Sequence, residues 1–270
     1  MRLGIGSYTY TWAVGVPGHL PPQPLSAMDL LANADRLGVR VAQFCDNLPL
    51  IGLPDTELDR LVRSAGDKGI HIELGTRGLA SDNLRAHLRL ARRLGCTFLR
   101  LVLDSSGDEP AADEALARLR EIMPEFRAAG IKLAVENHDR FPAAVLARLV
   151  EQLGPDQAGI CLDTVNSFGA LEGPEVVVEA LAPYTLNLHV KDFTIARVDS
   201  LMGFVINGCP AGTGRLNVPW LLERLAAAGR DVNAIVELWT PFGPTLEATL
   251  AQERAWAEES VRSLRQFIPS

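Results

Sequence analysis

A strand, a helix and a second strand can be read in one stretch, IKLAVENHDRFPAAVLARLVEQLGPDQAGICLD, residues 131–163. The stretch begins with a short apolar run at 131–136, continues with helical spacing, and reaches Gly154 before a second apolar run at 158–163. Short runs rich in Val, Ile and Leu are typical of buried strands, and glycine supplies the left-handed residue that follows a helix. The stretch therefore predicts one strand-helix unit followed by the next strand.

The same alternation can be counted eight times along the chain. Eight units without a linker or a low-complexity tract favour a closed (β/α)8 barrel, the TIM barrel, over an open doubly wound sheet. No GxGxxG motif follows the first strand, which argues against a dinucleotide-binding fold. The predicted strands are 2–7, 39–45, 70–75, 97–103, 131–136, 158–163, 185–190 and 234–239.

Helix start and stop signals fit this repeat. Ser, Asp and Pro are typical of the first turn of a helix, and glycine is typical of the residue after its last turn. Starts are expected at Ser26, Pro54-Asp55, Ser81-Asp82 and Pro174-Glu175, and ends at Gly38, Gly69, Gly95, Gly130, Gly154 and Gly229.

Length and composition are those of one ordinary globular domain. The 270 residues are close to the roughly 250 of a typical α/β barrel, so a single domain spanning 1–270 is expected. No apolar stretch approaches the roughly 20 residues of a membrane span, and no hydrophobic signal region follows Met1, so the sequence predicts a cytoplasmic protein without a membrane partner. The oligomeric state is left open, with a homo-oligomer as one possibility.

Charge and cysteine content narrow the class further. The 33 acidic and 26 basic residues give a net charge of −7, which would repel a phosphate backbone, so nucleic acid is not an expected partner. The cysteines form no CxxC pair and are expected to be reduced packing residues. They are Cys45, Cys96, Cys161 and Cys209.

Side-chain alternation along the last four predicted strands identifies a candidate metal site. One parity is apolar and should pack against the helices, Leu186 included, so the other parity should face the barrel interior. Each of these strands carries one inward metal-ligand type near its C-terminal end, where active sites of such barrels lie. The four residues are Glu136, Asp163, His189 and Glu237.

The convergence of three carboxylates favours a bound cation. Carboxylates that meet at a closed barrel mouth repel one another and lose hydration, so they need a positive charge nearby. One imidazole with three carboxylates suits Mn²⁺, Co²⁺, Mg²⁺ or Zn²⁺ and does not select strongly among them. The sequence thus predicts one divalent ion at the C-terminal face of the barrel.

Several short motifs around these residues make the chain resemble a known family. It resembles the xylose isomerase-like TIM-barrel superfamily of sugar phosphate isomerases and epimerases over essentially its whole length. The motifs are Val135-Glu136-Asn137-His138, Leu162-Asp163-Thr164-Val165-Asn166, Leu188-His189-Val190-Lys191-Asp192, Gly212-Thr213-Gly214-Arg215-Leu216 and Val236-Glu237-Leu238.

The resemblance implies a single divalent metal on Glu136, Asp163, His189 and Glu237, with the two glutamates as acid/base groups in epimerase members. The chain departs from those epimerases at one position. Three residues after the metal-binding Asp they carry His, where this chain has Asn166. This difference argues against ketose 3-epimerisation as such.

Further polar residues near the strand ends are candidate substrate contacts. Lys191 shares the inward parity of His189 and could bind a substrate carboxylate or oxyanion; the alternative is a salt bridge with Asp192 or another acidic side chain. The same parity makes His138 a candidate to orient substrate or donate a proton. Asn166 could contact substrate or orient a ligand, and Arg197 could clamp an anionic substrate from a long loop.

Other features are open to two interpretations. The inward residues Glu73 and Arg100 could pair with one another inside the barrel. The loop 208–214 suggests a phosphate cradle but lacks the lysine of a P-loop, so a tight turn or lid is the alternative. The two longest irregular segments, 13–24 and 193–218, are candidate lids. Three aromatic residues are candidates for an apolar wall over a sugar, namely Trp12, Phe44 and Trp239.

Two flanking glutamates, Glu136 and Glu237, favour an isomerase or epimerase of a small sugar, keto-sugar or sugar acid, acting through a metal-stabilised enediolate. Loss of CO2 from a 3-oxo sugar acid reaches the same enediolate. The basic groups of Lys191, Arg197 and His138 would suit that acidic substrate, so a decarboxylase is the alternative. A non-catalytic sugar-binding barrel is more remote. A DNA-repair endonuclease on the same fold is disfavoured, because five histidines and a negative net charge suit neither a trinuclear zinc site nor DNA.

Overall fold

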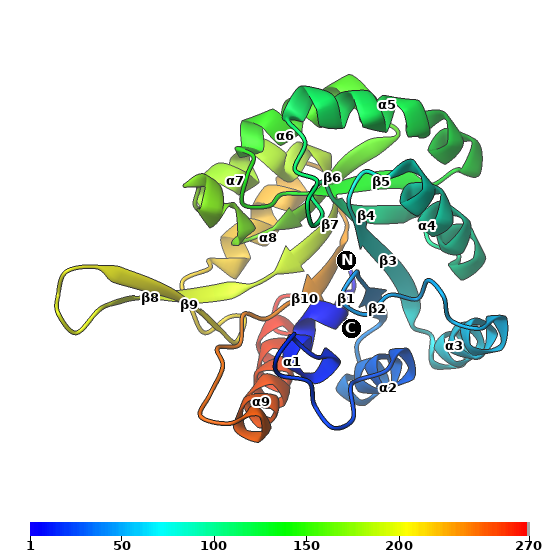
Figure 1. Ribbon diagram of the computed structural model, residues 1–270. Helices are drawn as coiled ribbons and strands as arrows, with labels where there is room; N and C mark the ends of the chain where they lie inside the picture. The colour runs from blue at the N-terminus through cyan, green and yellow to red at the C-terminus, as the bar shows by residue number, and fades with distance from the viewer. Residues whose placement is uncertain (269–270) are drawn as a thin grey trace.

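The computed structural model describes residues 1–268. In that range, eight parallel strands close into a barrel in the order β1-β10-β7-β6-β5-β4-β3-β2 (Figure 1). The predicted (β/α)8 barrel is therefore confirmed, and the predicted strand limits agree with the observed ones to within three residues. The strands are β1 (Leu3–Gly6), β2 (Val41–Phe44), β3 (His71–Arg77), β4 (Phe98–Val102), β5 (Lys132–Glu136), β6 (Ala158–Asp163), β7 (Thr185–Val190) and β10 (Asn233–Val236).

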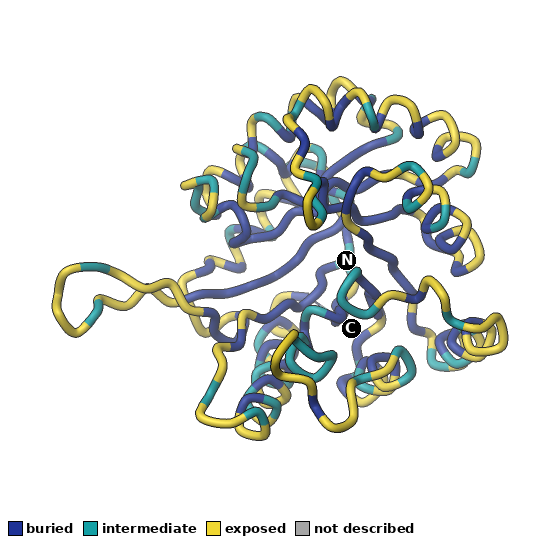
Figure 2. Tube along the Cα trace, in the orientation of Figure 1, coloured by how far each residue is buried: buried dark blue, intermediate teal, exposed yellow. Residues whose placement is uncertain are grey.

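A ring of helices surrounds the barrel, and the outer faces of these helices are exposed while the strands are buried (Figures 1 and 2). A short helix, α1 (Thr11–Val14), follows β1 on the face where the strands end. Within residues 1–268, no helix combines the length and apolar character needed to cross a membrane. The outer helices are α2 (Ala27–Leu37), α3 (Asp55–Lys68), α4 (Ser81–Leu94), α5 (Ala112–Ala129), α6 (Ala143–Leu153), α7 (Pro174–Leu181), α8 (Val218–Ala227) and α9 (Leu246–Leu264).

Most of the predicted helix signals are used as expected. Ser26 caps α2 in a capping box with Asp29, whose backbone amide donates to the Ser26 hydroxyl. One stop signal differs from the prediction, since Gly154 follows α6 with an extended ψ of 114° instead of a left-handed turn. After α8, Ala228 is the C-cap and Gly229 follows it in the left-handed region, with a φ of 70°. The left-handed C-caps are Gly38, Gly69, Gly95 and Gly130.

The barrel interior has an apolar base beneath its polar mouth. Phe98, Ala134 and Cys161 pack together inside the barrel, and Leu186 packs against them. The prediction that Leu186 faces the helices is wrong, because the pairing of β6 with β7 shifts register at Ile160/Cys161. The Leu186 side chain fills space beside Gly159, where a Cβ would lie 2.5 Å from the Leu186 Cγ. This base supports the polar residues nearer the C-terminal ends of the strands.

The segment 193–218, predicted as an irregular lid, contains a β-hairpin. Strands β8 (Asp192–Arg197) and β9 (Phe204–Cys209) pair antiparallel. The hairpin projects away from the barrel, and its outer half is exposed (Figures 1 and 2). The other predicted lid, 13–24, begins in α1 and continues through an isolated bridge between Val16 and His19.

Candidate active site

The four predicted metal ligands meet inside the barrel mouth. Glu136 ends β5, Asp163 ends β6, His189 lies near the end of β7, and Glu237 follows β10, and each is at most 2% exposed. His189 Nδ1 lies 3.2 Å from Glu237 Oε1, 3.4 Å from Glu136 Oε2 and 3.8 Å from Asp163 Oδ2. The structure thus brings together four side chains that are up to about 100 residues apart in the chain.

The donor atoms of this cluster have the spacing and the free valences that a divalent ion requires. Ligand atoms of Asp163, His189 and Glu237 all lie within 4.8 Å of one another. Atoms bound to one transition-metal ion at about 2.0–2.3 Å are separated by up to about 4.6 Å. His189 Nδ1 and Glu237 Oε1 are buried without a hydrogen-bond partner, and Glu237 Oε2 has only the ion pair with Lys191. Because buried polar atoms rarely stay unpaired, these residues fit a bound cation.

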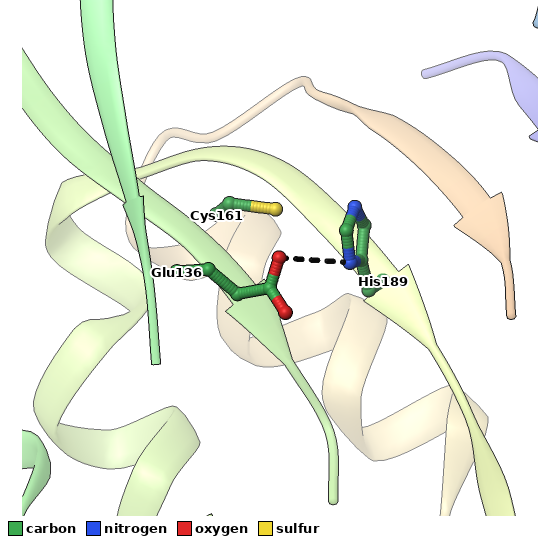
Figure 3. Close-up of side chains that lie close together, drawn as sticks. All are labelled: Glu136, Cys161 and His189. Atoms are coloured by element: carbon green, nitrogen blue, oxygen red, sulfur yellow. Dashed lines mark ion pairs between the residues drawn. The ribbon is translucent and has the colours of Figure 1, made fainter. Parts of the chain in front are cut away.

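Cys161 lies beside the same cluster. Figure 3 shows its thiol next to Glu136 and His189, and ligand atoms of the three residues fall within 4.8 Å of one another. Burial raises the pKa of the Cys161 thiol well above its ordinary value, so the sulfur is the neutral thiol here. All four cysteines are free and buried, which confirms the prediction that they are reduced packing residues.

Lys191 places a positive charge directly against the cluster. Its Nζ lies 2.7 Å from Asp163 Oδ2 and 2.8 Å from Glu237 Oε2, and it donates to Asn166 Oδ1 at 3.2 Å. Burial by itself would lower the pKa of Lys191, but Asp163 and Glu237 raise it above its usual value. The alternative role, a salt bridge with an acidic side chain, is therefore observed, and its partners are Asp163 and Glu237 instead of Asp192.

Arg100 is the second buried cation, and its partners differ from the prediction. It pairs with Glu136 through Nε and with Asp46 Oδ1 at 2.9 Å. The expected pair of Arg100 with Glu73 does not form, because Glu73 accepts from Gln43 and two asparagines instead. Burial would raise the pKa of Glu136, but Arg100 outweighs this effect and lowers it to about 2. Glu136 is therefore held as a carboxylate.

The predicted substrate contacts divide into three that line the cavity and one that does not. Asn166 donates from Nδ2 to Glu136 Oε1 at 2.9 Å, and Lys191 and His138 also line the cavity. Arg197 lies on the exposed hairpin, donates to the Leu201 carbonyl at 2.8 Å and stacks over Phe204. The structure therefore does not bring Arg197 to the site, because its segment forms β8 rather than a loop over the mouth.

The loop 208–214 is a tight turn around a carboxylate of the chain itself. Asp192 Oδ2 accepts from the backbone amides of Gly212 and Gly214, each at 2.9 Å, and Oδ1 accepts from Leu216 at 2.9 Å. The backbone amides that could bind a phosphate therefore already donate to Asp192. The phosphate-cradle interpretation is wrong, and the tight-turn alternative is confirmed.

A cavity of about 610 Å³ opens over the cluster. Trp12 and Trp239 form part of its wall, as predicted, whereas Phe44 is fully buried in the core and does not reach it. Arg77 and Tyr8, which the sequence did not single out, also line it. The lining residues are Tyr8, Thr11, Trp12, Arg77, Arg100, Glu136, His138, Asp139, Asn166, Gly169, Lys191, Glu237, Leu238, Trp239 and Thr240.

A buried carboxylate that the sequence did not predict supports the Trp12 side of the cavity. Glu253 on α9 is 1% exposed and accepts from the backbone amides of Trp12 at 2.8 Å and Ala13 at 3.0 Å. Burial raises the pKa of Glu253 to about 7, although the two amides act in the opposite direction. The carboxylate therefore anchors α1 next to the cavity.

Glu253 should make stability depend on pH. The Glu253 carboxyl loses its proton near pH 4.3 in the unfolded chain and near pH 7 in the folded chain. Between these two pH values the folded state binds more protons, so the free energy of unfolding falls as the pH rises. Relative to Glu253→Gln, the wild type should lose unfolding free energy between about pH 4 and 8, measured by urea denaturation. Glu247→Gln, on the exposed first turn of α9, is the control. Parallel curves for wild type and Glu253→Gln would contradict this expectation.

Residues 16–267 match the xylose isomerase-like TIM barrel family. The chain belongs to this family. The resemblance found in the sequence is thereby confirmed. Among curated relatives, this xylose isomerase-like barrel is 37% identical over 264 residues to 3-oxo-isoapionate decarboxylase of Pectobacterium atrosepticum, covering 98% of this chain and 95% of that protein.

Solved structures show the same xylose isomerase-like fold. D-psicose 3-epimerase in the presence of D-fructose superposes with a TM-score of 0.74 at 16% identity, over 100% of both chains. A xylose isomerase-like TIM barrel protein of Mycobacterium smegmatis in complex with magnesium has a TM-score of 0.66 at 16% identity, over 88% of this chain and 89% of that one. At such identities the likeness concerns the fold alone. Of these proteins, 3-oxo-isoapionate decarboxylase and D-psicose 3-epimerase are enzymes.

Proposed function

We propose that this protein is a divalent-metal-dependent decarboxylase of a 3-oxo sugar acid. The observation that carries the proposal is the 37% identity to 3-oxo-isoapionate decarboxylase over nearly the full length of both chains. The interpretation favoured by the sequence alone, an isomerase or epimerase, becomes the second candidate. The metal would be held by Glu136, Asp163, His189 and Glu237, with Mn²⁺, Co²⁺, Mg²⁺ and Zn²⁺ as candidates.

The charge balance of the site supports an acidic substrate. Four linked carboxylates, Asp46, Glu136, Asp163 and Glu237, pair with three cations, Arg77, Arg100 and Lys191. A divalent ion would turn the net charge of these groups from minus one to plus one. A monoanionic sugar acid would then bring them to neutrality, whereas a neutral ketose would leave a net positive charge.

The contacts of Glu136 also favour decarboxylation over two-base epimerisation. Epimerisation needs one group to remove a proton and another to return one on the opposite face. Both oxygens of Glu136 already accept hydrogen bonds, one from Arg100 and one from Asn166. A carboxylate stabilised in this way is a weak base. Decarboxylation does not begin with proton abstraction, so it does not require Glu136 to act as a base.

The chemistry assigned to the site is simple. The bond between the carboxyl carbon and C2 breaks, its electron pair passes to the 3-oxo oxygen, CO2 leaves, and C2 of the resulting enediolate takes up a proton. A bound divalent ion would supply Lewis-acid stabilisation of the negative oxygen. Lys191 adds positive charge from the cavity wall, and Trp12 and Trp239 cover the cavity with apolar surface. Lys191 and His138 are the cavity-lining residues best suited to deliver the proton to C2.

One observation keeps isomerase or epimerase chemistry as the second candidate. Glu237 Oε1 lacks a hydrogen-bond partner, and the side chain lines the cavity. Such a carboxylate can move a proton along one face of a bound sugar. A non-catalytic barrel is less well supported, since the compared relatives are enzymes.

Isotope exchange separates the two reactions. Purified protein with Mn²⁺ should incorporate no solvent deuterium into a panel of ketoses and aldoses, because the proposed reaction does not abstract a C–H proton. The product of a 3-oxo acid should instead carry one deuterium at the former C2. NMR and mass spectrometry measure both outcomes. Exchange into a ketose without CO2 release from any 3-oxo acid would establish the second candidate.

A further inference from the structure

A closed network of polar side chains lies beneath the metal-ligand cluster. Gln43 of β2 donates from Nε2 to Glu73 Oε2 at 3.1 Å and to Asn187 Oδ1 at 2.9 Å. Asn187 Nδ2 donates to Glu73 Oε2 at 3.0 Å, and Asn233 Nδ2 donates to Glu73 Oε1 at 2.7 Å. Gln43 Oε1 lies 2.7 Å from His189 Nε2. The network therefore joins four strands to the imidazole of the metal-ligand cluster.

The network leaves the Gln43 amide a single orientation. Asn187 Nδ2 also donates to the backbone carbonyl of Asn233 at 3.3 Å, so Asn187 Oδ1 is the atom that faces Gln43. Gln43 must then present its NH2 group to Asn187, and its Oε1 must face His189. Cys45 Sγ also lies 3.4 Å from this oxygen. Since Gln43, Asn187 and His189 are completely buried, water does not offer an alternative partner at Gln43.

The orientation of Gln43 decides which nitrogen of His189 can bind a metal. An amide oxygen accepts, so a neutral imidazole must carry its hydrogen on Nε2 and keep the lone pair on Nδ1. Nδ1 is the nitrogen that faces the carboxylates, 3.2 Å from Glu237 Oε1 (Figure 3 shows it toward Glu136). The imidazole is thus held in the tautomer that can coordinate at the cluster.

We propose that Gln43 is a positioning residue for the metal centre, acting with Glu73 as its anchor to fix His189 as the Nε2–H tautomer. The proposal rests on the metal-dependent function proposed above and adds two residues that do not touch the ion. Hydrogen-bonding partners of this kind change metal affinity by about 10- to 100-fold when they are removed.

The test compares metal affinity in variants that lose or keep the acceptor for His189. Gln43→Leu removes the acceptor and should weaken Co²⁺ binding by about 10- to 100-fold, measured by calorimetry and by the visible spectrum of bound Co²⁺. The double variant Gln43→Glu/Glu73→Gln exchanges the carboxylate and the amide. Asn187 can turn its amide over to donate to the new carboxylate, which still accepts from His189. The double variant should recover affinity to within a few fold of the wild type.

A control and a spectroscopic readout separate positioning from general damage. Thr185→Val removes a buried hydrogen bond on β7, the strand of His189, and should lower stability without changing Co²⁺ affinity. In Zn²⁺-loaded wild type, NMR should show the His189 Nε2–H proton protected from exchange, and the Gln43/Glu73 exchange variant should retain it. If Gln43→Leu does not fold, the Gln43→Glu/Glu73→Gln double variant still tests the proposal.

Four outcomes are decisive. Recovery of affinity and of the Nε2–H signal in the double variant supports the proposal. Wild-type affinity in a folded Gln43→Leu protein, or coordination of the ion through Nε2, overturns it. Failure of the wild type to bind any ion overturns the metal-dependent function itself, and so is distinguishable from failure of the positioning role.

Discussion

Asp163→Asn is expected to abolish the rise in melting temperature that Mn²⁺ produces in the wild type. An ion that binds only the folded state stabilises it by about 4 kcal/mol at a thousand times its dissociation constant, which corresponds to a shift on the order of 10 °C for a chain of this size. The ion-free variant should melt lower than the ion-free wild type, because its amide NH2 group would face the Lys191 ammonium where Asp163 Oδ2 now lies 2.7 Å away. Its side-chain oxygen can still accept from the amides of Val165 and Asn166, as Asp163 Oδ1 does at 2.9 Å.

Asp192→Asn is the matched control for this variant. Asp192 is also a buried carboxylate that accepts backbone amides, but it lies at the base of the hairpin. The Asp192→Asn variant should have a lower melting temperature than the wild type but keep the full rise in melting temperature on addition of Mn²⁺. Turnover of Asp163→Asn should fall by about 10³-fold or more, since metal stabilisation of a developing negative charge contributes several kcal/mol. A Mn²⁺ shift of wild-type size in Asp163→Asn would rule out the four-residue ion site.

Lys191→Met should separate catalysis from metal binding. The Lys191 ammonium lies 2.7 Å from Asp163 Oδ2 and 2.8 Å from Glu237 Oε2, so it competes with an ion for the same carboxylates. Its loss should raise Mn²⁺ affinity while turnover of a 3-oxo acid falls by about 10²- to 10³-fold, the usual effect of removing one group that stabilises developing charge. Titration calorimetry measures the affinity, and CO2 release measures the turnover.

Lys132→Met provides the comparison for the lost charge. Lys132 begins β5, at the opposite end of the strand from Glu136, and is exposed. This variant should leave both Mn²⁺ affinity and turnover unchanged. If Lys191→Met keeps wild-type turnover, the ammonium does not act on the substrate and its role is limited to balancing the carboxylates.

The convergence of the four candidate metal ligands could be predicted from sequence because it depends on local rules. Side chains alternate along a strand, and parallel strands of a barrel end at one face, so residues such as Glu136 and His189 can be assigned to one mouth without knowledge of their contacts. Gln43 offered the same kind of signal, since it is a polar residue at an inward position of an apolar run. Its partner Glu73 was also assigned inward.

The contacts that the sequence did not predict depend on stagger between distant strands. Glu73 and Arg100 share the inward parity, but they lie at different depths, so Arg100 meets Glu136 while Glu73 meets Asn233. Parity carries no information on depth. Arg197 was misplaced for another reason, because the pairing of β8 with β9 carries it away from the mouth. Glu253 occupies a helix position without any distinguishing pattern.

The most direct test of the proposed function is CO2 release from 3-oxo-isoapionate by the purified protein, first after chelation and then after Mn²⁺ is restored. The proposal predicts stoichiometric CO2 with Mn²⁺, loss of activity with chelator, and no activity in Asp163→Asn under either condition. Related 3-oxo sugar acids should be tested in parallel, because the natural substrate can differ from that of the relative. Undiminished CO2 release from the chelated, metal-free protein, or no CO2 from any 3-oxo acid with Mn²⁺ bound, would contradict it.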